Sequence, residues 1–247
     1  MERHGMYGSR AHLYDRIYHF KDYEKETVRV AEMLAAEGIE EGAAVLETAC
    51  GTGNFLVPLS ARYRVVGLDI SEGMVAVARE KVGDDVPVRC ADMCDFTLDA
   101  PVDAILCLFS SIGYLHPEAD LPRALAAFHR NLRPGGVLLI EPWLRPDRVK
   151  AGLPFLQTYH GKDEPLRLAR ACTGKLEGRK SVLDFHWLVA GPDGVEHFTD
   201  LHELWCQTED EWIAACDRAG FDARGVPAGI MGIEIDRGAV VGVRRDD

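Results

Sequence analysis

The chain has 247 residues, of which 47% are hydrophobic and 28% charged, a composition typical of one globular domain with a full core. It carries 28 basic and 40 acidic residues, which gives a formal net charge of −12. This acidity disfavours nucleic acid as a partner, because binding to phosphate backbones depends on clustered Lys and Arg. It also argues against a polybasic membrane anchor, and the sequence holds no apolar stretch of membrane-spanning length. We therefore expect a cytoplasmic protein that binds neither nucleic acid nor a membrane.

The seven cysteines are odd in number and form no CxxC pair, so we expect buried, reduced thiols. Cys90 and Cys94 have the spacing of half a metal site, but no second half lies near them in the sequence. His186, His197 and His202 also suggest a metal, yet the alternation of polar residues in a sheet explains them. We predict no metal site.

Taken in chain order, residues 23–37 form an amphipathic helix that ends at Gly38. Further helices follow through about residue 61, after the cap residue Ser71, and over the region 121–132. Short, nearly continuous apolar runs predict strands at 43–49, 64–70, 86–90, 102–109 and 136–143. Apolar strands that alternate with helices are typical of a parallel sheet covered on both faces, so the fold class is α/β, doubly wound and Rossmann-like.

The pattern changes after Trp143 to a two-residue period, which predicts an antiparallel insertion of roughly sixty residues. Its strands cover 167–174, 179–191 and 195–205, with a hairpin turn at 192–194. Thr208 and Glu211 then form a capping box for a last helix, which Gly220 ends. Two more strands, 221–226 and 238–243, complete the sheet, and the last is expected to be its antiparallel end. We divide the chain into a lid and core (1–142), the insertion (143–206) and the end of the core (207–247).

The most informative segment runs from Glu47 to Gly53, with the sequence ETACGTG, between a predicted strand and a helix. Asp69 ends the next strand, eighteen residues beyond Gly51, where a carboxylate can hold both hydroxyls of a ribose. A dinucleotide site needs a third glycine, and that position holds Leu56. A ligand with ribose and adenine but no phosphate therefore fits better, and S-adenosylmethionine (SAM) is such a ligand.

Asp92, after the third strand, is placed to accept a hydrogen bond from the adenine amino group, with Met93 beside it to pack on the ring. The alternative is that Asp92 only caps a helix. At this point the sequence resembles the class I SAM-dependent methyltransferases, over residues 45–143 and the last two strands. The resemblance implies a seven-stranded sheet. It also implies a cofactor site formed by Tyr23, Glu47, Ala49, Gly51, Gly53, Asp69, Ile70, Met74, Asp92, Met93, Leu108 and Phe109.

The region after the fourth strand separates the methyltransferase subclasses. Enzymes that methylate nucleobase amino groups have an Asn/Asp-Pro-Pro-aromatic run there, whereas this chain reads LFSSIGYL over 108–115. A small-molecule acceptor remains. A closer resemblance then rests on AHLYDRIYHFKDYEKE, LETACGTG, DMCDF, CLFSSIGYL, LRPGGVLLIEPW and VEHFTDLHEL. In order and spacing these are similar to the N,N-dimethyltransferases that act on dTDP-3-amino-3,6-dideoxyhexoses, the desosamine and mycaminose type.

This resemblance implies N-methylation, in antibiotic biosynthesis, of an amino sugar linked to dTDP, with an insertion that helps to build the acceptor site and pairs subunits into homodimers. Tyr14, Tyr114 and His116 are its catalytic candidates. Tyr14, Arg16, Trp143 and Arg237 are its candidates for binding the substrate, the two arginines through the diphosphate. The simpler interpretations are a tyrosine that only packs in a lid, a solvated loop histidine and surface arginines. The chain departs from the family pattern at Leu144, often a second Trp, and over 233–236.

Two other functions stay open. An O-methyltransferase acting on a phenolic or polyketide hydroxyl would need a stronger base than an N-methyltransferase, and it would not need Arg237. A protein that binds SAM without catalysis is disfavoured by the intact loop after the fourth strand.

Overall fold

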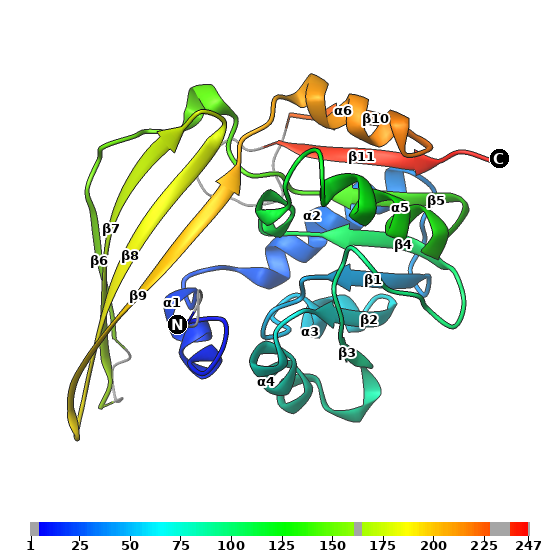
Figure 1. Ribbon diagram of the computed structural model, residues 1–247. Coiled ribbons are helices and arrows are strands. Elements are labelled where there is room, and N and C mark those ends of the chain that lie inside the picture. Colours follow the sequence, from blue (N-terminus) through cyan, green and yellow to red (C-terminus); the bar gives the residue numbers. More distant parts are fainter. Residues whose placement is uncertain (1–4, 161–164, 228–237, 247) are drawn as a thin grey trace.

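The computed structural model describes residues 5–160, 165–227 and 238–246, which form two sheets (Figure 1). The larger sheet has the strand order β10-β11-β5-β4-β1-β2-β3. Its strands are β1 (Ala44–Thr48), β2 (Arg64–Asp69), β3 (Val88–Cys90), β4 (Val102–Cys107), β5 (Leu132–Ile140), β10 (Phe221–Val226) and β11 (Ala239–Arg244). The smaller sheet is antiparallel and contains β6 (Phe155–Tyr159), β7 (Arg167–Glu177), β8 (Lys180–Gly191) and β9 (Gly194–Trp205). The prediction of a seven-stranded sheet with an antiparallel insertion is confirmed.

The described helices are η1 (Ala11–Leu13), α1 (Tyr14–Ile17), α2 (Tyr23–Ala36), α3 (Leu56–Ser60), α4 (Glu72–Val82), η2 (Gly83–Asp85), η3 (Ser111–Tyr114), α5 (Leu121–Asn131), η4 (Pro146–Arg148) and α6 (Glu209–Arg218). Among them, side-chain caps begin α2, α4 and α6. The Ser71 side chain accepts from the amide of Met74 at the start of α4, and Thr208 with Glu211 forms the predicted capping box at α6. Within the described ranges, no helix is long and apolar enough to span a bilayer.

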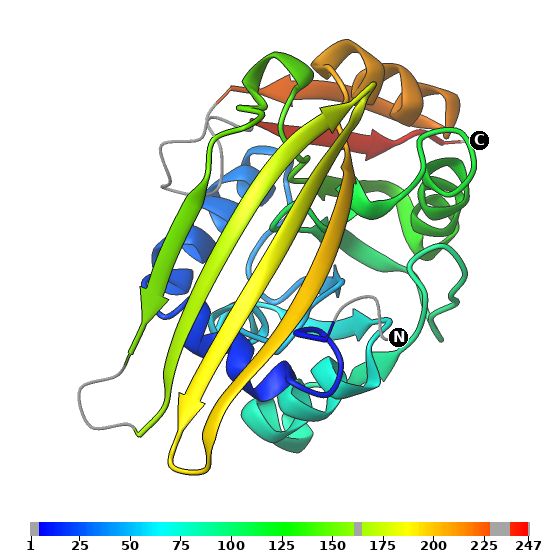
Figure 2. The ribbon, with the colours of Figure 1, turned by 60° about the vertical axis from the view of Figure 1, so that its left-hand side comes forward.

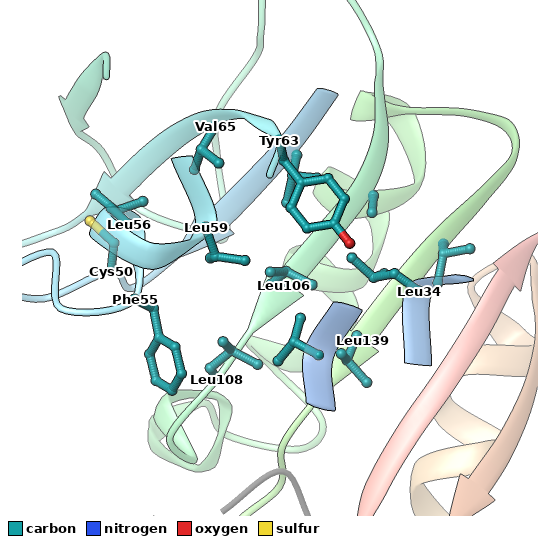
Figure 3. Packing of buried hydrophobic residues seen from close by; sticks show 14 of the residues in the cluster. Leu34, Cys50, Phe55, Leu56, Leu59, Tyr63, Val65, Leu106, Leu108 and Leu139 are labelled. Atoms are coloured by element: carbon teal, nitrogen blue, oxygen red, sulfur yellow. The ribbon is translucent and has the colours of Figure 1, made fainter. Parts of the chain in front are cut away.

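Two apolar layers lie on opposite faces of the larger sheet, because successive strand residues point in opposite directions. Val45 of β1 and Leu106 of β4 pack against α2, α3 and α4, and Figure 3 shows this layer from close by. Leu46 and Ile105, their neighbours along the two strands, pack on the other face against α5 and α6. Burial on both faces explains why these strands read as nearly continuous apolar runs in the sequence.

Two details of this sheet differ from the prediction. The strand β5 begins at Leu132, directly after α5, and ends at Ile140, so it begins four residues before the predicted start at residue 136 and ends before Trp143. The strand β11 is antiparallel, as predicted, but it lies between β5 and β10. The edge of the sheet is therefore β10, because two strands can complete this side of a sheet in either order and their sequences do not fix which one lies inside.

The smaller sheet contains the three predicted strands and also β6, which the two-residue period did not reveal. The hairpin between β8 and β9 turns at Pro192 and Asp193, within the predicted segment. One face of this sheet packs against residues 5–18, which we call the N-terminal segment (Figure 2). The apolar residues that meet there are Met6, Leu13, Ile17, Tyr159, Leu168, Trp187 and Val189. The N-terminal segment is thus held between the antiparallel sheet and the glycine loop described below.

Candidate active site

The loop between β1 and α3 holds three residues in the left-handed region of backbone space. Ala49, Gly51 and Gly53 have φ angles of 52°, 56° and 79°. Glycine adopts such angles without steric cost, whereas Ala49 is strained, and strained backbone is frequent at ligand sites. The loop also lies at the carboxyl end of β1, where open α/β sheets bind their ligands. The geometry therefore agrees with the predicted glycine-rich ligand loop.

Asp69 fixes this loop to the end of β2. Its two carboxylate oxygens accept from the amide of Gly51 (2.8 Å) and the amide of Ser71 (2.9 Å). Burial raises the pKa of Asp69, and these backbone N–H groups oppose the shift because they favour the charged form. Each oxygen keeps a second lone pair, so the carboxylate can still accept from two ribose hydroxyls.

Ile70 and Met74, two apolar residues that follow Asp69 in the chain, were predicted to contact the cofactor, and they differ from each other in burial. Ile70 is 70% exposed at the carboxyl edge of the sheet, an apolar surface on which a flat ring can pack. Met74 is buried, 3% exposed, in the first turn of α4. The exposed position of Ile70 fits an adenine platform better than the buried side chain of Met74.

Glu47 is a buried acid, one oxygen of which has no partner among the described residues. Its side chain lies at the end region of β1 with the residue 2% exposed, and Oε2 has no hydrogen-bond partner within the described part of the chain. Burial, together with the negative charge of Asp69, holds the pKa of Glu47 well above its ordinary value. A buried polar atom of this kind calls for a donor, and the methionyl ammonium of SAM is one of suitable charge. This orphaned oxygen is a direct indication that the site fits SAM.

Asp92 uses one carboxylate oxygen to accept from the amide of Cys94 at 2.8 Å, which is a local turn contact. Asp92 and its neighbour Met93 are both half-buried after β3. Between β3 and β4 the described chain forms a turn and no helix, so Asp92 does not cap a helix, and the turn contact leaves its second oxygen for the predicted contact with the adenine amino group.

The loop after β4 carries two consecutive strained residues, Phe109 and Ser110, with φ angles of 55° and 65°. The buried carboxylate of Glu141 accepts from the amide of Phe109 at 2.8 Å, and the hydroxyl of Ser110 donates to the carbonyl of Pro142 at 2.8 Å. The end of β5 therefore holds this loop in place. It leaves the Phe109 ring half-buried and buries Leu108, 2% exposed, in the core.

The N-terminal segment is attached to the glycine loop through Asp15 of α1. The Asp15 carboxylate accepts from the hydroxyl of Thr52 (2.5 Å) and from the side-chain amide Nδ2 of Asn54 (2.9 Å), and it pairs with Lys81 of α4 (2.6 Å). Lys81 also donates to the side-chain oxygen of Asn54. These contacts join α1, the glycine loop and α4, as expected for a segment that covers a cofactor.

Tyr23 begins α2 and lies against the glycine loop. Its ring packs edge-on against Phe55 with a centroid distance of 5.1 Å. The ammonium of Lys21 lies 4.0 Å from the ring centroid of Phe109 and pairs with the buried carboxylate of Glu26 at 2.9 Å. The predicted cofactor residues Tyr23 and Phe109 thus share one buried aromatic and ionic cluster.

An aromatic cluster links the N-terminal segment to η3 and β9. Tyr14 packs on Tyr18 (4.8 Å between centroids) and on Tyr7 (6.0 Å). Tyr18 packs edge-on against Phe109 at 4.9 Å. Tyr7 packs edge-on against Tyr114 at 6.3 Å, and their hydroxyl oxygens lie 3.1 Å apart. The structure therefore brings the predicted Tyr14 and Tyr114 into one cluster, next to the loop that follows β4.

His202 of β9 completes this cluster, and the sequence did not reveal it. Its Nδ1 lies 2.5 Å from the hydroxyl oxygen of Tyr114, and its ring packs edge-on against Tyr7 at 5.4 Å. His202 is 5% exposed, whereas His186 and His197 stack on each other at the exposed face of the same sheet. The three histidines therefore do not converge on one point.

The ring of His116 packs outside the aromatic cluster that contains Tyr114. Its ring packs against Trp205 with a centroid distance of 4.6 Å, and its Nδ1 accepts from the amide of Glu118 at 3.2 Å. The imidazole that contacts Tyr114 is His202. A catalytic role of His116 stays a prediction, and its Nδ1 is engaged in a local turn.

The predicted acceptor residues on the other elements are partly placed. Trp143 is half-buried after β5, and a Cβ at Gly113 would lie 2.9 Å from the Trp143 Cβ, so this glycine lets η3 approach the tryptophan closely. Arg16 is half-buried on α1. Arg237 lies outside the described residues, directly before Gly238.

Comparison with known proteins assigns the class. Residues 45–136 match the family described as a methyltransferase domain. The chain is 35% identical over 238 residues to the dTDP-4-amino-2,3,4,6-tetradeoxy-D-glucose N,N-dimethyltransferase of Saccharopolyspora spinosa, which covers 95% of this chain and 92% of that protein. It is 32% identical over 237 residues to the dTDP-3-amino-3,4,6-trideoxy-alpha-D-glucopyranose N,N-dimethyltransferase of Streptomyces venezuelae, which covers 94% of this chain and 97% of that protein.

Solved structures agree. DesVI of Streptomyces venezuelae superposes with a TM-score of 0.85 at 32% identity, over 95% of this chain and 98% of that one. The SAM-bound amino pentose methyltransferase CalS10 of Micromonospora echinaspora gives 0.81 at 31% identity, over 94% of this chain and 96% of that one. The protein is therefore a class I SAM-dependent methyltransferase with SAM as its cofactor. Within that class, the chain belongs to the family of amino-sugar N,N-dimethyltransferases.

Proposed function

We propose that this enzyme transfers methyl groups from SAM to the amino nitrogen of a dTDP-linked amino deoxysugar in antibiotic biosynthesis, and that it adds two. The observation that carries the proposal is the half-buried tyrosine cluster at the carboxyl edge of the sheet, in contact with the loop after β4. The relatives named above act on amino sugars linked to dTDP. Their amino groups lie at C4 in one case and C3 in the other, so both positions belong in the test.

The chemistry asks little of the protein beyond alignment. SAM supplies an electrophilic methyl group on a sulfonium sulfur. The rings of Tyr14 and Tyr114 provide a dry environment of mild negative potential, which favours a cation at the reacting nitrogen. The hydroxyls of the two tyrosines are the groups that can hydrogen-bond the amine and orient its lone pair.

The nucleotide part of the acceptor needs cations and space. A cavity of about 230 Å³ is lined by residues that include Pro142, Arg145 and Gly238. Trp143, beside Pro142, packs against Gly113 of η3, so the segment after β5 connects this cavity with the loop that carries Tyr114. Arg237 precedes Gly238 directly. We further propose that Arg237 and Arg16 hold the diphosphate, because a guanidinium group matches phosphate oxygens.

The experiment is turnover with isotopically labelled SAM on a matched panel, read by mass. The panel holds a dTDP-3-amino sugar, a dTDP-4-amino sugar, the corresponding free amino sugars and a phenol. We expect successive additions of one and two methyl groups on a nucleotide-linked amine only. Transfer to the phenol alone would favour the O-methyltransferase, and no transfer to any acceptor despite SAM binding would favour a non-catalytic role.

The substitution Arg237→Ala tests the diphosphate contact. It should raise the acceptor KM and leave SAM affinity unchanged, because the contact is equal in the ground and transition states. Equal rates on nucleotide-linked and free amino sugars would contradict the role of Arg237.

We also propose that the insertion, residues 143–206, pairs two copies of the chain into a homodimer while its inner face borders the acceptor. The cross-strand pairing places four apolar side chains on the same, outer face of the smaller sheet: Leu156, Leu188, Val195 and Leu201. They are between 47% and 74% exposed and share this face with the exposed His186 and His197. Exposed apolar side chains on a sheet face are typical of an interface. Light scattering should show a dimer, and Leu188→Asp should make it a monomer.

We place the enzyme in the cytoplasm, as expected from the sequence, because all seven cysteines are free thiols.

A further inference from the structure

His202 reaches the tyrosine cluster from the inner face of the antiparallel sheet. It lies on β9, 88 residues after Tyr114, and its Nδ1 is 2.5 Å from the hydroxyl oxygen of that tyrosine. The imidazole is 5% exposed and packs edge-on against Phe185 of β8 at 4.9 Å. The surrounding rings fix its orientation, so the short contact with Tyr114 is built into the fold.

Among the described residues, the titratable groups that contact or neighbour His202 come from the N-terminal segment, η3 and β9. Tyr7 of the N-terminal segment packs on its ring, Tyr114 of η3 bonds to its Nδ1, and Asp200 lies two residues earlier on the same face of β9. The Asp200 carboxylate accepts from the amides of Gly5 and Met6 at 2.5 and 3.3 Å. Its negative charge favours a positive charge on a nearby imidazole.

Tyr114 is the half-buried member of the pair, and its hydroxyl oxygen lies 3.1 Å from that of Tyr7 and 2.5 Å from Nδ1 of His202. Under the proposed function, this hydroxyl hydrogen-bonds the acceptor amine. Burial raises the pKa of Tyr114 well above its ordinary value, the hydrogen bond with Tyr7 opposes the shift, and the nearby Tyr18 and Asp200 add to it. The phenol therefore stays neutral and cannot keep a proton taken from a substrate unless it passes its own hydrogen on. Among the described residues, His202 is the nearer of these two hydrogen-bond partners and the one that offers a basic nitrogen.

We propose that Tyr114 and His202 form a proton relay that keeps the acceptor amine neutral. This inference rests on the proposed function. A proton leaves the substrate ammonium for the Tyr114 oxygen while the phenolic hydrogen passes to Nδ1 of His202. The N–H bond of the ammonium breaks and its electron pair stays on nitrogen, where it forms the bond to the incoming methyl as the bond from that methyl to the sulfonium sulfur breaks and leaves its electrons on sulfur. The phenol is regenerated and His202 becomes an imidazolium, so His202 is a positioning residue that acts through Tyr114. After the methylated product leaves, the relay runs in reverse: Nδ1 returns its proton to the Tyr114 oxygen while the phenolic hydrogen passes to water in the emptied acceptor site, so one proton is released for each methyl group transferred.

The substitution His202→Asn tests the relay directly, because the asparagine oxygen can replace Nδ1 as a hydrogen-bond acceptor but cannot take up a proton. We expect the variant to keep its melting temperature and SAM affinity. Its kcat near neutral pH should fall by about one to two decades, below the full contribution of a general base. The loss should shrink as the pH rises, because free amine then becomes available without the relay. A purely structural defect would lower kcat equally at every pH.

Two variants serve as comparisons. His197→Asn makes the same change on the outer face of β9, away from Tyr114, and should leave the pH–rate profile unchanged. Tyr114→Phe breaks the relay at its other member and should show the same pH-dependent loss, which also keeps the test valid if His202→Asn does not fold. The double variant should lose no more kcat than the less active of the two single variants, because the two residues act as one unit.

A second readout does not depend on turnover. In the ¹⁵N NMR spectrum of histidine-labelled enzyme, Nδ1 of His202 should be unprotonated and hydrogen-bonded at neutral pH, and Tyr114→Phe should shift its signal. A protonated Nδ1 in the resting enzyme would overturn the relay. So would a wild-type pH–rate profile in His202→Asn while the wild type methylates the amine. A wild-type enzyme that methylates no amino sugar overturns the proposed function itself, and the relay with it.

Discussion

The N-terminal segment is predicted to control SAM affinity through its contact with α4, and Gly73→Ala isolates that contact. Gly73 lies in the first turn of α4, and a Cβ there would be 2.5 Å from the carbonyl oxygen of Gly8. Since the obstacle is main chain, the N-terminal segment must move by roughly 1 Å to restore an ordinary contact. The neighbouring hydrogen bond from the Ser71 hydroxyl to the carbonyl of Tyr7 would then be lost or lengthened.

The expected magnitude follows from two opposing effects. The lost hydrogen bond and packing weaken docking of the segment by about 1–2 kcal/mol. Alanine strengthens the helix by up to about 1 kcal/mol relative to glycine. The net loss is at most about 2 kcal/mol, so the melting temperature should fall by no more than about 8 °C. SAM affinity should nevertheless fall by about 5- to 30-fold, provided that the docked segment is needed for binding.

Calorimetric titration with SAM and thermal unfolding measure the two quantities on the same samples. Ala76→Gly, on the exposed face of α4, changes helix propensity without touching the N-terminal segment and should lower stability alone. An unchanged SAM affinity in Gly73→Ala would refute the reasoning, because the segment would then dock without consequence for the cofactor.

Three further predictions concern buried and paired charges. Burial raises the pKa of Glu47 in the free protein, whereas the methionyl ammonium of SAM favours its ionised form. SAM binding should therefore release a proton, and the affinity for SAM should increase as the pH rises. Calorimetry in two buffers should show this proton release in the wild type and its absence in Glu47→Gln. Glu26→Ala leaves the Lys21 ammonium buried without its carboxylate and should cost about 3–5 kcal/mol in urea unfolding. Burial alone would raise the pKa of Asp103, but its hydrogen bond from Arg133 helps to lower it, so the carboxylate stabilises the fold above its unfolded pKa. The stability difference between wild type and Asp103→Asn should shrink as the pH falls from about 6 to about 3.

The core strands were predictable because burial on both faces removes polar residues from them. The strand β6 was not predictable, because it is an edge strand paired only with β7 among the described strands, and its adjacent residues Phe155 and Leu156 both remain exposed. The residue alternation of β9 was visible in the sequence, but alternation does not say which face points inward. His202 and Asp200 lie on the inner face because the N-terminal segment and η3 offer polar partners there, a contact that links residues up to 195 positions apart.

The cofactor side and the acceptor side of this site differ in how the sequence encodes them. Glu47, Gly51 and Asp69 lie on consecutive strand–loop units, so their spacing is set by local geometry and can be recognised as a motif. Tyr7 and His202 come from opposite ends of the chain and meet only through packing of the antiparallel sheet on the N-terminal segment. If Tyr7 and His202 border the acceptor as we propose, acceptor specificity can change by substitution in these two segments while the glycine loop and Asp69 stay the same. A substitution that loosens the inner face of β9 should disturb the acceptor KM and the pH–rate profile more strongly than SAM binding, because that face contacts the tyrosine cluster directly, whereas its link to the glycine loop runs through the N-terminal segment.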